Sequence, residues 1–414
     1  MLGLARSGEA AALALARRGV GVVGVDRDPI LEAGRLRTAG VEVRLGADAD
    51  VSLLEGVEVL VKSPGVRREA PLVEAARQRA VPVWSEIELG AQLVAQPTVG
   101  VTGTNGKTTT SELLGAIFRA GGREAAVCGN VGRPLCGLDG ALRGDEAVVC
   151  ELSSFQLEDV ETLRCHVAVL LNLTVDHLDR HGDLASYRDA KLRIFENQGP
   201  DDLAVLPRGF DAGAGGIPGR GRRVEFASDD ALPAEPLIRG EHNRENAAAA
   251  TAAARAAGIS DEAIAEALST FPGVPHRLEP IREIGGVLFV NDSKATNPES
   301  AEGALLAYEA GSLRVIMGGS RKGSSFEALA RAASMQRVLR VYLIGETAEE
   351  LAGALEETGV GHVACGDLDT AVHRAHAEAE PGEVVLLSPA CASFDQFRDF
   401  EHRGQRFREL VEAL

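Results

Sequence analysis

A segment rich in glycine and threonine carries one lysine, Gly103-Thr104-Asn105-Gly106-Lys107-Thr108-Thr109, between an apolar stretch and a helix-like stretch. Glycines let backbone N–H groups converge on an anion, and the N-terminus of the following helix adds its dipole. Lys107 can neutralise the charge of β- and γ-phosphates, and the Thr108 hydroxyl can reach Mg²⁺. The segment therefore predicts a phosphate loop that binds ATP.

The match to the general pattern G-x-x-x-x-G-K-[ST] is imperfect, because the first glycine would fall at position 101. This chain has Val101 there, and Gly100 comes one residue early. A plain glycine turn with an incidental lysine is the alternative that this segment alone leaves open. The rest of the chain must decide between the two.

Acidic residues and a histidine follow two further strand-like runs. Glu151 ends a run that we expect beside the phosphate-loop strand, where a carboxylate can hold Mg²⁺. A charge at a helix N-terminus is the alternative for Glu151. Asp176, His177 and Asp179 follow the other run, where polar loops usually face a ligand. A lone histidine is more often an ordinary surface residue, but beside acids and a phosphate loop His177 becomes a candidate metal or substrate contact.

Two polar segments in the C-terminal third, 291–297 and 388–397, also follow strand-like runs. Open parallel sheets bind ligands at the carboxyl ends of their strands, so we expect a site in a cleft between the central and third domains. Lys191 lies in an amphipathic helical pattern, and by that pattern alone it is a solvated charge.

The elements that must position these residues alternate between strand and helix along the chain, which predicts an α/β fold with mostly parallel sheets. A length of 414 residues suggests two or three domains, and we expect three. They are a Rossmann-like domain at 1–92, a P-loop ATPase-like domain with a parallel sheet at 93–273, and a second Rossmann-like domain at 274–414. Only two residues precede the opening glycine turn, so the first strand is expected to be truncated; dinucleotide binding there is a weak alternative.

Composition excludes several classes of protein. The net charge of −18 argues against a nucleic-acid partner, and no apolar run approaches the roughly 20 residues that span a bilayer. No secretory signal is visible, which favours the cytoplasm. The six cysteines show no C-x-x-C spacing, so we expect small buried hydrophobic side chains and neither a zinc site nor a disulfide framework.

Taken together, these motifs resemble the Mur ligases over nearly the whole chain. The segments that carry the resemblance are 103–109, 151–157, 176–180, 240–246, 275–277, 291–296 and 388–397. The short phosphate loop of that family, G-T-N-G-K-[ST], accounts for the mismatch at Val101. The third domain lacks the D-N-P-R signature of the relatives that add diaminopimelate or lysine, and 388–397 resembles the D-glutamate-adding type.

The resemblance implies an ATP-dependent amide ligase that adds D-glutamate to UDP-N-acetylmuramoyl-L-alanine through an acyl phosphate, a cytoplasmic step of peptidoglycan biosynthesis. It implies two Mg²⁺ ions and a carbamylated Lys191, and we expect a monomer. Another Mur-type or folylpolyglutamate-type amide ligase is the enzymatic alternative. A nucleotide-binding regulatory module without catalysis is the other, although Lys107, Glu151, His177 and Lys191 together argue against it.

The resemblance also assigns site residues one by one. The implied catalytic residues are Lys107, Glu151, His177 and Lys191, and the implied metal contacts are Thr108, Glu151, His177 and Lys191. The residues implied for ATP are Gly103, Thr104, Asn105, Gly106, Lys107, Thr108, Thr109, Asn243, Asn246, Arg277, Asp292 and Lys294. Those implied for the UDP-linked substrate are Arg6, Ser7, Asp26, Arg27, Ser63, Gly65 and Asn130, and those for D-glutamate are Thr296, Lys322, Ser393 and Phe400.

Overall fold

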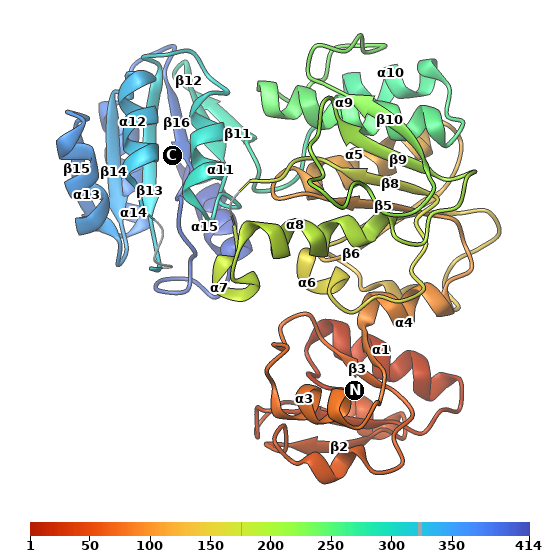
Figure 1. The fold of residues 1–414 in the computed structure, drawn as a ribbon. Helices are drawn as coiled ribbons and strands as arrows, with labels where there is room; N and C mark the ends of the chain where they lie inside the picture. The colour runs from red at the N-terminus through yellow and green to blue at the C-terminus, as the bar shows by residue number, and fades with distance from the viewer. Residues whose placement is uncertain (175, 322–324) are drawn as a thin grey trace. The chain divides into compact units, whose positions relative to one another are not determined.

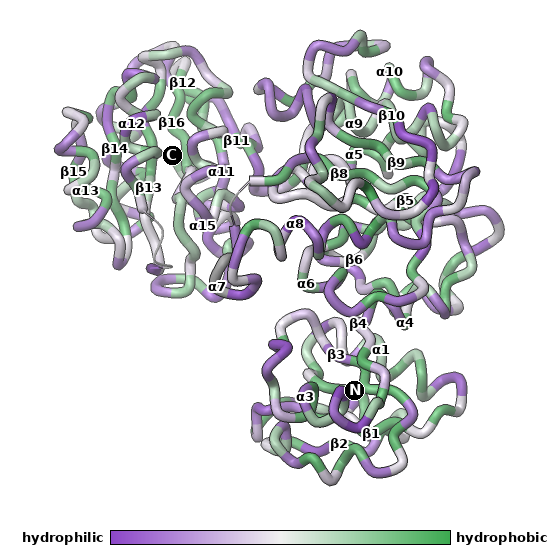
Figure 2. The backbone as a smooth tube through the Cα atoms, in the orientation of Figure 1, coloured by the Kyte–Doolittle hydropathy of each residue, from purple (hydrophilic) through white to green (hydrophobic). Residues whose placement is uncertain are grey.

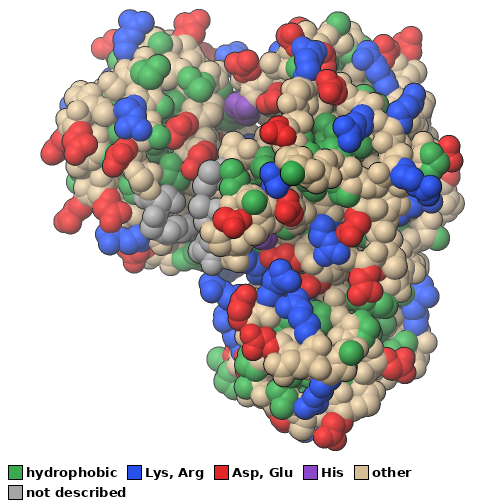
Figure 3. Space-filling view, viewed as in Figure 1, with side chains coloured by type: hydrophobic (Ala, Val, Ile, Leu, Met, Phe, Trp, Pro, Cys, Tyr) green, Lys and Arg blue, Asp and Glu red, His purple; other side chains and the backbone are tan. Residues whose placement is uncertain are grey.

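The computed structural model describes residues 1–174, 176–321 and 325–414, without the side chains of residues 178 and 179. The chain divides into two compact units (Figure 1). The first unit comprises 1–235 and 245–269, and the second comprises 236–244 and 270–414. Charged side chains of both signs are scattered over the face of each unit in Figure 3, as the high content of charged residues requires.

The first unit opens with short parallel strands and helices. The elements are α1 (Arg6–Arg17), β1 (Val23–Asp26), α2 (Gly34–Thr38), β2 (Glu42–Leu45), η1 (Val51–Leu54), β3 (Leu60–Lys62), α3 (Pro71–Gln78), β4 (Val83–Ser85) and α4 (Glu86–Leu93). Strand β1 pairs with β2, and β3 pairs with β4. Leu2 forms parallel bridges to both Val25 and Lys62, so it stands between β1 and β3 where a first strand was expected.

The larger part of the first unit is a six-stranded parallel sheet in the order β10-β9-β8-β5-β7-β6. Its elements are β5 (Thr98–Thr102), α5 (Lys107–Ala120), β6 (Ala125–Gly129), η2 (Leu135–Leu138), β7 (Ala147–Glu151), α6 (Ser154–Leu157), β8 (Val167–Leu170), α7 (Leu178–His181), α8 (Leu184–Leu192), η3 (Arg193–Phe195), β9 (Leu203–Pro207) and β10 (Arg222–Phe226), followed by α9 (Glu241–Ala256) and α10 (Asp261–Thr270). Strands β5, β7 and β8 are buried along their whole length, as expected for parallel strands covered on both faces.

The second unit holds another six-stranded sheet, ordered β11-β12-β16-β13-β14-β15, in which only β11 runs antiparallel to its neighbour. Its elements are β11 (Glu279–Ile284), β12 (Val287–Asn291), α11 (Pro298–Leu305), β13 (Leu313–Gly318), α12 (Glu327–Met335), β14 (Arg340–Ile344), α13 (Ala348–Glu357), β15 (His362–Gly366), α14 (Leu368–Glu378), β16 (Val384–Leu387) and α15 (Phe400–Ala413). The strands of this sheet, β12 and β16 among them, form the hydrophobic centre of the unit (Figure 2).

Parallel sheets and alternating helices confirm the predicted α/β class. The stretch 208–223 is rich in glycine and arginine, a composition typical of a loop, but its last two residues begin strand β10. Strand β10 lies at the edge of the sheet, where the charged side chains of Arg222 and Arg223 stay exposed. The remaining stretch, 208–221, contains no helix or strand.

Candidate functional site

The phosphate loop lies between β5 and the start of α5 at Lys107. Gly106 has φ +84°, a conformation that favours glycine, and a Cβ there would lie 2.1 Å from Asn246 Oδ1. Asn172, after β8, fastens the loop from the neighbouring strand: its side-chain oxygen accepts from Asn105 N at 2.9 Å, and its carbonyl accepts from Thr104 N at 3.1 Å. Asn246, predicted for ATP, therefore packs directly against the loop. Asn172 was not predicted as a site residue.

Two lysines share one carbonyl of this loop. Lys107 Nζ donates to the carbonyl oxygens of Gly103 (2.9 Å) and Thr104 (2.7 Å), and Lys191 Nζ donates to Gly103 O at 2.7 Å. Lys191 is only 2% exposed, and burial followed by the nearby Lys107 charge lowers the pKa of Lys191 well below its ordinary value. The interpretation of Lys191 as a solvated charge is therefore wrong, because this face of α8 packs beneath the phosphate loop.

Glu151 lies at the end of β7, paired in register with Val101 of the phosphate-loop strand, as predicted. Its side chain is buried, and its Oε1 accepts from Asn130 Nδ2 at 2.9 Å. A residue predicted for the metal and one predicted for the UDP-linked substrate thus meet beside the phosphate loop.

His177 has a left-handed backbone conformation, with φ +52°, and its ring has two aromatic neighbours. Its ring lies edge-on to Phe155, with centroids 4.8 Å apart, and 6.3 Å from the ring of Tyr187. Its Nε2 lies 3.5 Å from Asp176 Oδ2, and the side chain is 46% exposed. His177 can therefore reach a ligand in solvent while one side of its ring packs against Phe155.

The predicted metal contacts differ in the donor atoms that they offer to a cation such as Mg²⁺, which prefers oxygen. No group of three or more His, Cys, Asp and Glu side chains able to hold a metal occurs in the described part of the chain. Mg²⁺ instead takes one or two protein oxygens together with waters and substrate phosphates, so the Thr108 hydroxyl and the Glu151 carboxylate fit it. The imidazole of His177 suits this hard cation less well.

The residues predicted for the UDP-linked substrate gather around the opening glycine turn. Asp26 Oδ2 accepts from Leu4 N at 2.6 Å, and Ser63 Oγ donates to Gly3 O at 2.9 Å. Arg6 and Ser7 begin α1 next to this turn, and Arg6 Nη1 lies 3.4 Å from Gly132 O, in the loop that carries Asn130. Arg27 and Gly65 lie exposed in the loops that follow β1 and β3.

In the second unit, the segments 291–297 and 388–397 follow the paired parallel strands β12 and β16, so they begin at the same edge of the sheet. Asp292 is buried there; its Oδ2 accepts from Ser388 Oγ at 2.8 Å. Burial raises the pKa of Asp292 to about 7, opposed chiefly by the charge of Arg277. Lys294 Nζ lies 5.7 Å from the centroid of the Phe400 ring.

The other residues predicted for this part of the chain have different surroundings. Asn243 Nδ2 donates to Arg239 O at 2.7 Å. Ser393 is buried and Thr296 half-buried, in the two segments after β16 and β12. Lys322 lies outside the described residues.

Arg403 of α15 was missed by the sequence analysis. It is 1% exposed and donates to Ser293 Oγ and to the carbonyl oxygens of Ser293, Cys391 and Ala392, at 2.9 to 3.2 Å. It therefore ties together the two strand-end segments. Its neighbours in sequence are mostly polar and charged, so nothing in the pattern of α15 signals its burial.

The chain matches the model of the Mur ligase middle domain at 101–214 and that of the Mur ligase glutamate ligase domain at 276–391. It is 43% identical to the UDP-N-acetylmuramoylalanine--D-glutamate ligase of Anaeromyxobacter dehalogenans, over 99% of this chain and 96% of the relative. It is also 43% identical to the ligase of the same name from Geobacter metallireducens, over 100% and 97%.

Solved structures share the fold at low identity. The UDP-N-acetylmuramate-alanine ligase of Thermotoga maritima is 21% identical, with a TM-score of 0.63 over 100% of this chain and 98% of that one. The FolC protein of E. coli, solved with DHPP and ADP, is 19% identical, with a TM-score of 0.58 over 79% and 92%. In the described part of the chain, no helix is both long and apolar enough to cross a membrane.

Proposed function

The chain belongs to the UDP-N-acetylmuramoylalanine--D-glutamate ligases of the Mur ligase family, and we propose how its residues divide the work of that reaction. The enzyme is an ATP-dependent amide ligase that adds D-glutamate to UDP-N-acetylmuramoyl-L-alanine in peptidoglycan biosynthesis. We place this step in the cytoplasm and expect a monomer. We keep the division into a UDP-substrate-binding domain at 1–92, an ATP-binding domain at 93–273 and an amino-acid-binding domain at 274–414.

In the proposed chemistry, the alanyl carboxylate attacks the γ-phosphate of ATP, which forms an acyl phosphate and releases ADP. The amine of D-glutamate then attacks the acyl carbon, an amide bond forms, and inorganic phosphate leaves. Phosphoryl transfer depends on alignment and charge neutralisation more than on covalent help from the protein. The two lysines that converge on Gly103 O are the single observation that best supports this role for the phosphate loop.

The residues of the first unit are assigned to the reacting end of the substrate. We assign the γ-phosphate to Lys107 and the backbone N–H groups at the start of α5, and Mg²⁺ to Thr108 and Glu151. Bound Mg²⁺ would neutralise charge that develops on the phosphate oxygens. We propose that His177 positions the acyl phosphate. We also propose that Asn130, which donates a hydrogen bond to Glu151, contacts the UDP-linked substrate.

Lys191 is the proposed site of carbamylation. CO₂ adds to a neutral amine, and the buried position of Lys191 beside a second lysine favours that neutral form. The resulting carbamate would be an anion, which is suited to a second Mg²⁺. His177 is the other candidate contact of that ion, although its nitrogen is a poorer ligand than an oxygen.

The second unit is assigned to the nucleotide and to the amino acid. We propose that Arg277, Asp292 and Lys294 hold ATP together with Asn243 and Asn246, with Asp292 on the ribose hydroxyls. Thr296, Ser393, Phe400 and Lys322 are proposed to form the D-glutamate pocket. The buried Arg403 supports the pocket, because it fixes the segments that carry Thr296 and Ser393.

Trapping the intermediate tests this chemistry. ATP and UDP-N-acetylmuramoyl-L-alanine are mixed without D-glutamate, and sodium borohydride is added to reduce an acyl phosphate to the alcohol. We expect the alcohol with the native enzyme and none with Lys107→Ala. Its absence with an active native enzyme would contradict the acyl phosphate.

A further inference from the structure

A largely buried network of charges links β3 and the loop after it, at residues 63–66, to the segment that follows α6 and to α7. Lys62, at the end of β3, is fully buried, and its Nζ lies 2.9 Å from Asp159 Oδ2 and 3.9 Å from Glu158 Oε2. Arg77 of α3 adds an ion pair to Asp159 Oδ1 at 2.9 Å. A buried charge without a partner is costly, so Lys62, Glu158 and Asp159 favour the arrangement in which their charges stay paired.

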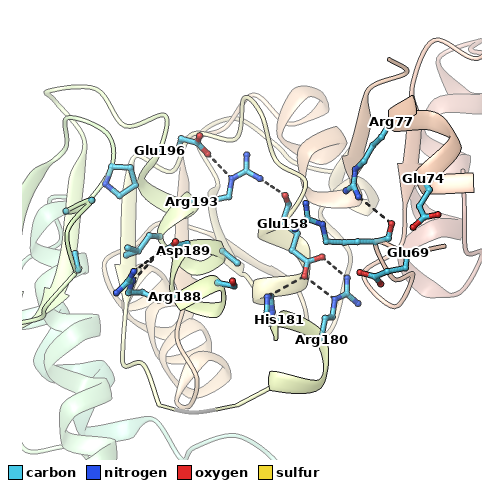
Figure 4. A pocket seen from close by; sticks show the side chains of 18 residues that line it. Glu69, Glu74, Arg77, Glu158, Arg180, His181, Arg188, Asp189, Arg193 and Glu196 are labelled. Carbon is cyan, nitrogen blue, oxygen red and sulfur yellow. Dashed lines mark hydrogen bonds and ion pairs between the residues drawn. The ribbon is translucent and has the colours of Figure 1, made fainter. Parts of the chain in front are cut away.

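Arg180 of α7 connects this network to the backbone of the loop. Its Nη1 donates to Pro64 O at 2.9 Å, and its Nη2 donates to Val66 O at 3.2 Å. The same guanidinium makes a two-point ion pair with Glu158, at 3.1 and 2.8 Å (Figure 4). A planar guanidinium with five donors can make all four contacts at once, whereas an ammonium cannot.

The same guanidinium also lies over the ring of Phe155, a neighbour of the candidate metal contact His177. Its Cζ lies 4.1 Å from the centroid of the Phe155 ring, and that ring packs edge-on against His177. His181, on the same short helix, donates to or accepts from Ser154 Oγ at 3.0 Å and faces Glu158. Arg180 thus touches the loop of residues 63–66 and the aromatic support of His177.

This loop carries Ser63 and Gly65, two of the residues that the resemblance implies for the UDP-linked substrate, and it belongs to the proposed UDP-substrate-binding domain. We infer that Arg180 is a positioning residue that fixes the UDP-binding loop at a set distance from His177 and the phosphate loop. This inference rests on the proposed function. The UDP group and the alanyl carboxylate are opposite ends of one substrate, so a loop set at the wrong distance weakens binding of the whole molecule and spares ATP.

The pocket next to this network does not argue for a separate ligand. It has a volume of about 980 Å³, and arginines and carboxylates line it in equal number: Arg68, Arg77, Arg180, Arg188, Arg193, Glu69, Glu74, Glu158, Asp189 and Glu196. Several of these side chains point toward one another and pair within the pocket (Figure 4). The charges of the network therefore pair with one another and hold the loop at 63–66, and they do not form a site for an ion.

Arg180→Gln tests the inference in the full-length enzyme, with UDP-N-acetylmuramoyl-L-alanine and with N-acetylmuramoyl-L-alanine, which lacks the UDP group. Loss of two charge-assisted hydrogen bonds to the loop should raise KM for the UDP-linked substrate roughly tenfold or more. We expect kcat and KM for ATP to stay within about twofold, and the slow rate with the truncated substrate to match the native enzyme. Arg180→Lys keeps the charge but lacks the planar, forked guanidinium, so its KM for the UDP-linked substrate should lie between the values of the native enzyme and of Arg180→Gln.

Arg77→Gln is the matched control, because it removes an ion pair from the same network without touching residues 63–66. It should leave KM for the UDP-linked substrate nearly unchanged. Equal losses with both substrates in Arg180→Gln, or an unchanged KM, would overturn the inference. If Arg180→Gln does not fold, Arg180→Lys decides by the same comparison. If the native enzyme shows no turnover of the UDP-linked substrate, the proposed function itself is overturned.

Discussion

Glu86 is a buried carboxyl group whose surroundings should make the stability of the protein depend on pH. It is the first residue of α4 and is 0% exposed, and its Oε1 accepts from Cys136 N at 2.7 Å. Its Oε2 finds no hydrogen-bond partner in the described part of the chain. Burial raises the pKa of Glu86 to about 7, and the hydrogen bonds from Cys136 offset only part of that rise.

The raised pKa makes stability depend on pH with a defined sign. An unfolded chain releases the Glu86 proton near pH 4.5, whereas the folded chain keeps it until about pH 7. Between these values the folded state binds more protons, so the free energy of unfolding falls as the pH rises. Over this whole pH interval the free energy of unfolding falls by about 3 kcal/mol.

Glu86→Gln should remove this loss, because the amide is neutral at every pH and its oxygen can still accept from Cys136 N. The variant and the native protein should differ by about 1 kcal/mol or less at pH 5, and the variant should be more stable by about 3 kcal/mol at pH 8.

Urea unfolding followed by tryptophan fluorescence measures the difference. The sole tryptophan, Trp84, is two residues from Glu86 and reports on the same unit. A variant that is no more stable than the native protein at pH 8 would refute the reasoning.

Three further substitutions test the site. Lys191→Ala should lower turnover about 10²- to 10³-fold in a phosphate-release assay, with partial recovery in short carboxylic acids; full activity would remove this residue from the mechanism. Gly106→Ala places a Cβ 2.1 Å from Asn246 Oδ1 at a positive φ and should raise KM for ATP at least about tenfold; an unchanged KM would show that the loop can relax. Arg403→Met leaves the hydroxyl of Ser293 and nearby carbonyl groups without their hydrogen-bond donor. It should therefore lower the free energy of unfolding in urea by about 2 to 4 kcal/mol and raise KM for D-glutamate. No change in either quantity would contradict the proposal that Arg403 fixes the segments that carry Thr296 and Ser393.

Much of the fold was predictable because apolar runs of strand length alternate with amphipathic helical stretches. The mainly apolar runs at 287–291 and 340–344, for example, coincide with β12 and β14. The positions of candidate site residues were predictable where polar residues end or directly follow such runs, as at Glu151 and Asp292, because parallel strands end at a common edge.

The remaining features depend on contacts between distant segments. Lys191 and Arg403 lie in helices whose sequence pattern resembles an exposed surface, and only packing against the loops at 103–104 and 391–393 buries them. Strand β10 contains two arginines and is stabilised by its pairing with β9, which no local pattern reveals. Arg180 belongs to a recognised motif, but its partners at Pro64 and Val66 are more than a hundred positions away.

The most direct measurement is phosphate release from ATP with UDP-N-acetylmuramoyl-L-alanine and one acceptor at a time: D-glutamate, L-glutamate, meso-diaminopimelate or L-alanine. We predict release that depends on D-glutamate and on no other acceptor. Release with a different acceptor, or none with D-glutamate, would contradict the assignment.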